Sequence, residues 1–155
     1  MHPEREIRKL AKSFRNAFAG MAEVVRNERN FRIHICMMFY VVVFSIIGEV
    51  PKSAMLCFLL CFGAVAFAEM FNTAIEKLCD AVEENFDERI RTIKDIAAGG
   101  VLVVALFSAI IGLFVFLSPD IFGRIIETIC RVPVIGIVIA LSLPIAVLFV
   151  LKRGK

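Results

Sequence analysis

Acidic residues enter a long apolar run at one place in this sequence. The stretch Glu69–Asp80 follows the almost purely apolar run Ala54–Ala68. Four polar side chains of that stretch fall within an arc of about 80° on an α-helix and extend along about 16 Å of its length. They are Glu69, Asn72, Glu76 and Asp80. The spacing therefore predicts one polar face on an otherwise apolar helix.

Carboxylates and an amide on one helix face have two main chemical uses. Their oxygens bind a divalent cation, or a carboxylate takes a proton from a nearby hydroxyl. A carboxylate at membrane depth costs about 3 kcal/mol on insertion scales, so its presence there needs a reason. The alternative is that these acids only mark where a helix leaves the membrane. That alternative suits Asp80 and Glu76, but it explains Glu69 poorly.

The composition favours a membrane protein of one domain. The chain has 155 residues, of which 59% are hydrophobic and 21% charged, and its mean hydropathy is +0.83. These values differ strongly from those of soluble domains. The net charge of +3 is too small to indicate a nucleic-acid partner. Signatures of soluble nucleotide-binding enzymes, such as GxxxxGK[ST] and GxGxxG, are absent from the sequence.

The periodicity predicts an all-α, integral-membrane helical bundle. Residues 3–29 alternate apolar and basic side chains at helical spacing, which is typical of an amphipathic helix in the headgroup plane. Apolar segments then predict four spans, at about residues 33–50, 53–79, 96–117 and 132–151. We divide the chain into a main membrane domain, residues 1–120, and a C-terminal extension, residues 121–155. His34 is predicted to be an interfacial side chain rather than a ligand.

The basic residues predict the orientation of the spans. Fifteen of the 18 Lys and Arg lie in residues 1–32, residues 77–94 and the tail that contains Lys152, Arg153 and Lys155. Four spans put these segments on one side, which the positive-inside rule assigns to the cytoplasm. Residues 80–95, which include Glu84, are predicted to form a polar loop. The acidic face and this loop should therefore meet at the cytoplasmic interface.

Four motifs in the right order resemble one known family. The chain reads Glu69-Met-Phe-Asn-Thr-Ala-Ile-Glu and, after polar residues, Lys94-Asp-Ile-Ala-Ala-Gly. This pattern resembles the signature of the prokaryotic integral-membrane diacylglycerol kinases and their undecaprenol kinase relatives. Phe14-Arg-Asn-Ala-Phe-Ala-Gly and Glu28-Arg-Asn-Phe-Arg-Ile-His match the family's N-terminal pattern. The likeness covers about residues 10–118.

The resemblance implies a fold and a reaction. Family members are homotrimers of three-span protomers with an amphipathic surface helix, and their active sites lie between protomers at the cytoplasmic face of a bacterial cytoplasmic membrane. They transfer the γ-phosphate of ATP to a lipid hydroxyl with Mg²⁺. By resemblance, Glu69 is the general base, Asn72 orients the reacting groups, and Glu28 and Glu76 hold the metal and the nucleotide.

The resemblance also implies a nucleotide site with residues of the third span. Lys94 would contact the phosphates, Asp95 would order Lys94 or the nucleoside, and Asp80 would join the same site. Positioning, a metal and a cation at the phosphates are what phosphoryl transfer needs. No residue is assigned to the lipid substrate.

Two features depart from the family pattern, and other functions stay open. The typical chain ends soon after the third span, so the fourth span is an extra element. The motifs favour undecaprenol as substrate, with diacylglycerol as the alternative.

From a different class, a non-catalytic membrane scaffold would use Glu69 and Glu76 only to stabilise an oligomer. A proton or ion pathway is the third possibility, but the sequence shows no partner charge deeper in any span.

Overall fold

The computed structural model describes residues 3–83 and 87–152, which form six helices. They are α1 (Pro3–Asn27), α2 (Arg29–Ile47), α3 (Lys52–Val82), α4 (Glu88–Phe116), α5 (Pro119–Arg131) and α6 (Pro133–Leu151). By length and composition α2, α3, α4 and α6 are able to cross a membrane. The predicted all-α membrane bundle with four spans is therefore confirmed. Glu84, Arg153 and Lys155 lie outside the described residues.

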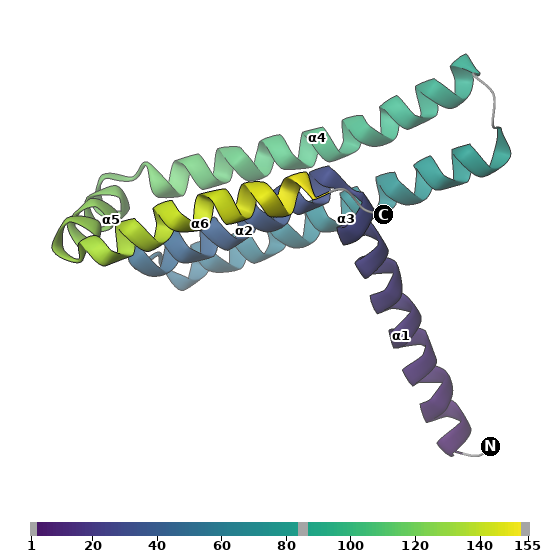
Figure 1. The fold of residues 1–155 in the computed structure, drawn as a ribbon, viewed down its shortest axis with the longest axis horizontal. Coiled ribbons are helices and arrows are strands. Elements are labelled where there is room, and N and C mark those ends of the chain that lie inside the picture. Colours follow the sequence, from purple (N-terminus) through teal and green to yellow (C-terminus); the bar gives the residue numbers. More distant parts are fainter. Residues whose placement is uncertain (1–2, 84–86, 153–155) are drawn as a thin grey trace.

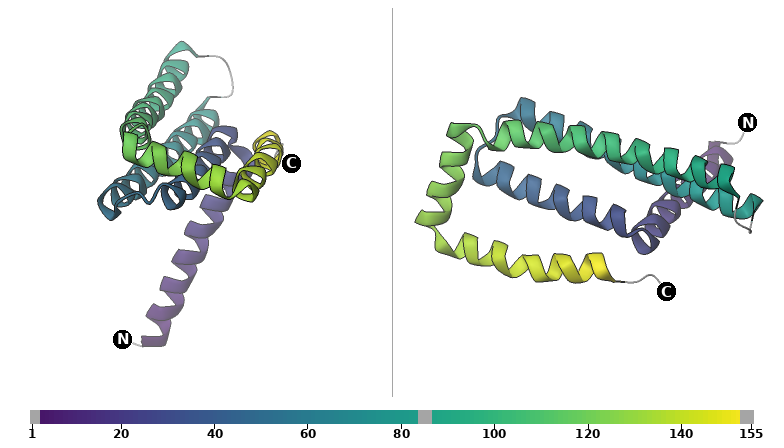
Figure 2. Two further views of the ribbon diagram at one scale, coloured as in Figure 1. Left: turned by 90° about the vertical axis from the view of Figure 1, so that its left-hand side faces the viewer. Right: turned by 90° about the horizontal axis from the view of Figure 1, so that it is seen from above.

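The four spans run alongside one another, and α1 leaves them at a steep angle (Figure 1). Helices α3 and α4 share the most extensive contact of any pair, while α6 packs against α2. The short helix α5 crosses one end of the bundle and connects α4 to α6, as Figure 2 shows. The joint between α1 and α2, the C-terminal end of α3, the start of α4 and the C-terminal end of α6 all lie at the other end.

Helix α1 is attached to the bundle near its own C-terminal end. Val24 is its buried apolar residue, whereas Leu10, Phe14 and Phe18 are exposed. Lys77 Nζ of α3 lies 3.0 Å from Glu23 Oε1 of α1, which adds an ion pair at the attached end. An exposed apolar face on a basic helix suits a position in the headgroup layer, as the sequence predicted.

The structure corrects the predicted polar loop at residues 80–95. Helix α3 continues to Val82, and α4 begins at Glu88. Asp87 caps α4, since its Oδ1 accepts hydrogen bonds from the backbone N–H of Arg89 at 2.7 Å and of Ile90 at 3.4 Å. The charged side chains near the end of α3 and the start of α4 do not interrupt these helices. Lys94 and Asp95 consequently lie on a helix, not on a loop.

A second difference is α5, which the sequence analysis treated only as a connection between spans. Its Ile121 and Ile125 are buried with Val50 in an apolar cluster at this end of the bundle. Arg124 Nε donates a hydrogen bond of 2.9 Å to the backbone oxygen of Gly48, the C-cap of α2. Helix α5 thus satisfies a carbonyl that the end of α2 leaves without an intrahelical partner.

Gly48 makes the close approach between α2 and α5 possible. A Cβ atom at this position would lie 2.9 Å from Ile121 Cγ2 and 3.0 Å from Ile125 Cγ1. Side-chain carbons do not approach so closely without a shift of the surrounding structure. The contact between the two helices therefore depends on the absence of a side chain at residue 48.

Replacing Gly48 by alanine should destabilise this end of the bundle. Overpacking of this kind costs about 1–3 kcal/mol, so the thermal unfolding midpoint of Gly48→Ala in detergent should fall. Gly123→Ala on α5 is the matched control, because a Cβ there meets nothing within 4 Å. In the control the midpoint should stay or rise, since alanine favours a helix by up to about 1 kcal/mol. Equal stability of the two variants would contradict the close approach.

Candidate active site

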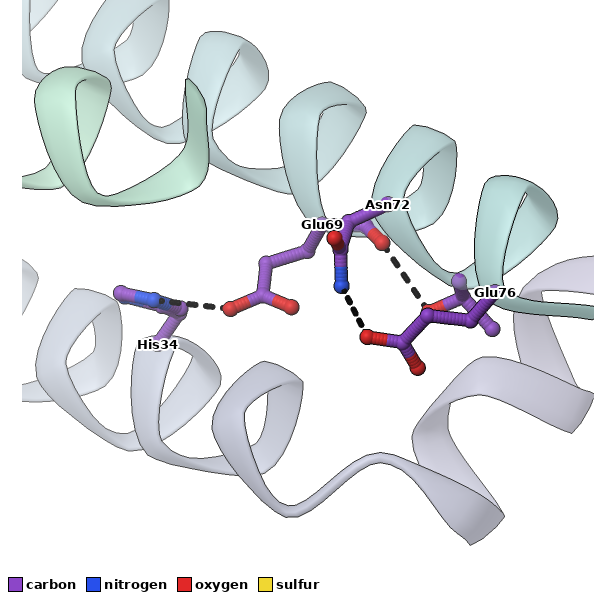
Figure 3. A network of polar contacts seen from close by, with 5 residues as sticks. His34, Glu69, Asn72 and Glu76 are labelled. Atoms are coloured by element: carbon purple, nitrogen blue, oxygen red, sulfur yellow. Dashed lines mark hydrogen bonds and ion pairs between the residues drawn. The ribbon is translucent and has the colours of Figure 1, made fainter. Parts of the chain in front are cut away.

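Glu69 lies in the middle of the bundle, on the face of α3 that meets α2. Its side chain points toward His34 of α2, and His34 Nε2 lies 3.2 Å from Glu69 Oε1 (Figure 3). Glu69 is 2% exposed. Among the described residues, Oε1 forms no hydrogen bond of good geometry. A buried carboxylate oxygen is therefore available to accept a proton or a hydrogen bond from a ligand.

Asn72 and Glu76 extend the same polar face toward the end of α3, one and two turns beyond Glu69. Asn72 Nδ2 donates a hydrogen bond of 2.8 Å to Glu76 Oε1. The other end of the amide, Oδ1, is buried and has no hydrogen-bond partner within the described residues. Thr73 Oγ1 donates to the backbone oxygen of Glu69 at 3.0 Å. The sequence prediction of one polar helix face is confirmed, and two of its acceptors remain unused.

A cavity of about 230 Å³ adjoins this face. Glu69 and Asn72 line it from α3, and Asn30 and His34 line it from α2. Helix α4 contributes apolar and small side chains to the lining, Ala98 among them. A cavity with polar groups on one wall and apolar groups on the other suits the hydroxyl end of an apolar molecule.

Glu28 occupies the joint between α1 and α2 and lies close enough to Glu76 for their charges to interact. Partial burial raises the pKa of Glu28 above its ordinary value, and the neighbouring Glu76 charge raises it further. The positive charges of Lys77 and Arg32 act in the opposite direction. The structure thus brings Glu28 to the acidic face of α3, from which it is separated by about 40 residues of sequence.

The acidic residues fit a metal that is shared with a nucleotide better than a metal held by protein alone. Within the described residues, no three His, Cys, Asp or Glu side chains gather as a ready ligand set. Glu28 and Glu76 form a pair of carboxylates that repel each other. Mg²⁺ in phosphoryl-transfer sites is commonly held by one or two carboxylates together with the substrate phosphates. The pair therefore fits Mg²⁺ in that role.

Lys94 and Asp80 form an ion pair between α4 and α3. Glu76 also lies within electrostatic reach of Lys94, which places a cation next to the acidic face. Asp95 is different, because its ion pair among the described residues is with Arg91 on its own helix, at 3.8 Å between Nε and Oδ2. Asp95 was expected to order Lys94, but in this structure Asp95 pairs with Arg91 and Lys94 pairs with Asp80.

His34 is the site residue that the sequence analysis missed. It was predicted to be an interfacial side chain, yet it faces Glu69 inside the bundle. The sequence analysis did not place His34 beside Glu69, because helical spacing within one segment does not show how α2 packs on α3. The sequence did contain an indication of this position, because His34 is the last residue of the motif Glu28–His34 that resembles the family pattern.

The comparisons with known proteins decide the family. The family model described as prokaryotic diacylglycerol kinase matches residues 15–116. The chain belongs to the prokaryotic diacylglycerol kinase family. This membership confirms the predicted enzyme class, a lipid kinase that transfers phosphate to an alcohol. The match ends at the last residue of α4, so α5 and α6 lie outside it.

Two curated relatives resemble this kinase. The first is the undecaprenol kinase of Bacillus subtilis, 35% identical over 112 residues, which are 72% of this chain and 91% of the relative. The second is the diacylglycerol kinase of Synechocystis, 33% identical over 111 residues, or 71% of this chain and 63% of that protein. No solved structure matches the chain significantly.

The raised pKa of Glu28 predicts how the stability of this kinase depends on pH. A raised pKa means that the folded protein binds this proton more tightly than the unfolded chain does. The stability that the protonated Glu28 contributes is then fully present below the ordinary pKa of 4.5. It is lost as the pH rises through the raised pKa. In metal-free detergent, the thermal unfolding midpoint of the wild type should fall as the pH rises above 4.5. Glu28→Gln should make this fall smaller.

Glu23→Gln is the control for that experiment. The hydrogen bond from Lys77 lowers the pKa of Glu23, so its contribution is lost as the pH falls rather than as it rises. Glu23→Gln should leave the decline above pH 4.5 unchanged. A decline of equal size in the wild type and in Glu28→Gln would contradict the assignment to Glu28.

Proposed function

We propose that this kinase transfers the γ-phosphate of ATP to the hydroxyl group of undecaprenol and produces undecaprenyl phosphate. One observation carries the mechanism: the carboxylate of Glu69 is buried beside a cavity, and within the described residues its Oε1 contacts His34 but accepts no hydrogen bond of good geometry. The apolar lining from α4 suits a lipid chain that enters from the bilayer. The hydroxyl at the end of that chain would reach Glu69.

In the proposed reaction Glu69 accepts the proton of the lipid hydroxyl. The hydroxyl oxygen forms a bond to the γ-phosphorus, and the bond from that phosphorus to the β–γ bridging oxygen breaks, which releases ADP. His34 lies beside Oε1 and holds the carboxylate on the α2 side of the cavity. Asn72 would orient the reacting groups through its free Oδ1, because its amide nitrogen is fixed by Glu76.

Glu28 and Glu76 are the proposed holders of Mg²⁺ with ATP. When bound, Mg²⁺ neutralises negative charge on the phosphates, including charge that develops during transfer. Glu28 lies at the α1–α2 joint and Glu76 lies on α3, so a metal held by both would sit between the joint and α3. The phosphates bound there would point along α3 toward Glu69, two turns from Glu76.

Lys94, Asp80 and Asp95 are proposed as further parts of the nucleotide site. Lys94 would exchange its partner Asp80 for the ATP phosphates, since phosphate oxygens bind an ammonium group strongly. Asp80 would then be free to accept hydrogen bonds from the nucleotide. Asp95 is exposed on α4, one residue beyond Lys94, where a nucleoside can reach it.

The choice of undecaprenol over diacylglycerol is supported by the relatives. The chain covers 91% of the undecaprenol kinase, but only 63% of the diacylglycerol kinase. The identities differ little, so diacylglycerol, which would give phosphatidic acid, stays the alternative substrate. The motifs Glu28–His34 and Asn72–Glu76 also resemble the undecaprenol kinases more closely.

The proposal includes an assembly and an orientation. We expect a homotrimer in the bacterial cytoplasmic membrane, with the active site on the cytoplasmic side. The orientation is supported by the arrangement of the basic segments: the α1–α2 joint, the end of α3, the start of α4 and the end of α6 lie at one end of the bundle (Figure 1). The same end carries Glu28, Glu76 and Lys94.

Glu69→Gln should abolish most of the phosphorylation of lipid. General base catalysis contributes about 10²- to 10⁴-fold, and glutamine keeps the size of the side chain without its basicity. The measurement is transfer of labelled phosphate from ATP to undecaprenol and diacylglycerol, offered side by side to the purified protein in mixed micelles with Mg²⁺. Glu127→Gln on the exposed side of α5, at the other end of the bundle, is the control.

Each outcome of that assay has a definite meaning. Preference for undecaprenol supports the proposal, and preference for diacylglycerol replaces the substrate while it keeps the mechanism. Full activity of Glu69→Gln would remove Glu69 as the base. Failure of the wild type to label either lipid would overturn the proposed function.

Lys94→Met should raise the KM for ATP more than it lowers kcat. Methionine keeps the apolar part of the side chain and removes the charge that contacts the phosphates, which typically costs about tenfold or more in affinity. Steady-state kinetics over a range of MgATP concentrations measures both constants. Lys52→Met, at the far end of α3, is the control with an exposed lysine. An unchanged ATP dependence would remove Lys94 from the phosphate site.

A further inference from the structure

Helix α6 lies outside the family match, and none of its described residues is buried. It nevertheless makes polar contacts with α2 at intervals of four residues. Tyr40 Oη lies 2.9 Å from Ser142 Oγ, and Cys36 Sγ lies 4.0 Å from the backbone oxygen of Ala146. The third contact joins Arg32 to the backbone oxygen of Val150. Since polar contacts between membrane helices fix their register, α6 is attached to α2 in a defined position.

Arg32 makes the most extensive of these contacts. Although it is charged, it is 5% exposed. Its Nε and Nη2 donate to the Val150 oxygen at 3.3 and 3.2 Å. Its Nη1 donates to the oxygens of Val25 at 3.1 Å and Arg26 at 2.7 Å. No carboxylate forms an ion pair with Arg32 within the described residues.

The acceptors of Arg32 share one property: they belong to the last turns of two helices, α1 and α6. Carbonyls in a last turn have no intrahelical partner, and the helix dipole gives this end a partial negative charge. One guanidinium group thus satisfies carbonyls at the ends of two helices, and the Val150 carbonyl is 118 residues from Arg32 in sequence. Without the Val150 oxygen, two N–H groups of a buried cation would lose their acceptor.

The joint that Arg32 stabilises is also the position of Glu28. Glu28 is the N-cap of α2, and its backbone N–H donates to Val24 of α1 at 2.8 Å. Its backbone oxygen accepts a hydrogen bond of 3.3 Å from the N–H of Arg32. The direction in which the side chain of Glu28 points therefore depends on the angle between α1 and α2. The contacts of Arg32 fix this angle.

We propose that Arg32 is a positioning residue and that the end of α6 is part of the catalytic unit, because together they hold Glu28 where it meets Mg²⁺ and ATP. This inference rests on the proposed function, which places the metal and nucleotide at Glu28 and Glu76. It assigns a role to the extra span: α6 supplies one of the two carbonyl acceptors that keep Arg32 in place. Helix α6 is then a support for the nucleotide site rather than an appendage.

The test compares two shortened chains and two substitutions. A chain that ends after Leu148 lacks the Val150 carbonyl, and a chain that ends after Lys152 retains it and serves as the matched control. Arg32→Lys keeps the charge but lacks the planar fork that contacts both helix ends. Tyr40→Phe is the second control, because it removes the hydroxyl that contacts Ser142 on the same interface, far from the joint.

The expected result is a change in nucleotide affinity rather than in the chemical step. The chain that ends after Leu148 and the Arg32→Lys variant should each raise the KM for MgATP about tenfold, with kcat at saturating MgATP changed less than about twofold. The two controls should behave like the wild type. Combining Arg32→Lys with the shorter chain should add little further effect, because both changes remove the same contact.

Amide hydrogen exchange of residues 24–32 provides a readout that does not need the reaction. Exchange there should become faster in the chain that ends after Leu148 and stay unchanged in the one that ends after Lys152. Faster exchange with an unchanged KM for MgATP would overturn the positioning role, and unchanged exchange would overturn the support by α6. A wild type that phosphorylates no lipid would overturn the proposed function, whereas the exchange experiment would still decide whether α6 holds the joint. Additive effects on KM in the combined variant would also contradict the proposal.

Discussion

The carboxylate of Glu69 is a polar group in an apolar bundle, and the arrangement around it follows from that constraint. An ionised side chain at membrane depth is costly unless other polar groups surround it. His34 meets it from α2, and Asn72 and Glu76 continue the polar face along α3. The start of α2 brings Glu28, and α4 brings Lys94, toward the end of α3 that carries Glu76 and Asp80. The position of one buried acid thus fixes which faces of α2, α3 and α4 turn toward one another.

Much of this arrangement could be predicted because helical periodicity is a local property. The spacing of Glu69, Asn72 and Glu76 defines one face before any tertiary contact is known, and the four apolar segments define the spans. What periodicity does not contain is the rotation of one helix relative to another. His34 was misplaced for that reason, since only packing of α2 on α3 turns it toward Glu69. The polar segment at residues 80–95 was misjudged because composition does not separate a solvated helix from a loop.

Two arginines connect the C-terminal extension to α2 at its opposite ends. Arg124 of α5 donates to the carbonyl oxygen of Gly48 at the C-cap, and Arg32 in the first turn of α2 donates to the end of α6. Each contact satisfies carbonyls that helix ends leave free. Neither pair could be predicted from the sequence, because both acceptors are backbone oxygens far away in the chain. At both arginines the acceptor is a main-chain oxygen, so these two contacts do not depend on the side chain of the accepting residue.

The short helix α5 also changes where the polypeptide finishes. A chain with three spans and its N-terminus on the side of the nucleotide site would finish on the opposite face of the bilayer. Because α5 reverses the direction and α6 runs back along the bundle, the C-terminal end of α6 lies at the same end as the α1–α2 joint (Figure 2). A fusion partner, affinity tag or tether attached after Lys152 would therefore lie beside the α1–α2 joint, next to the contact of Arg32 with the end of α6.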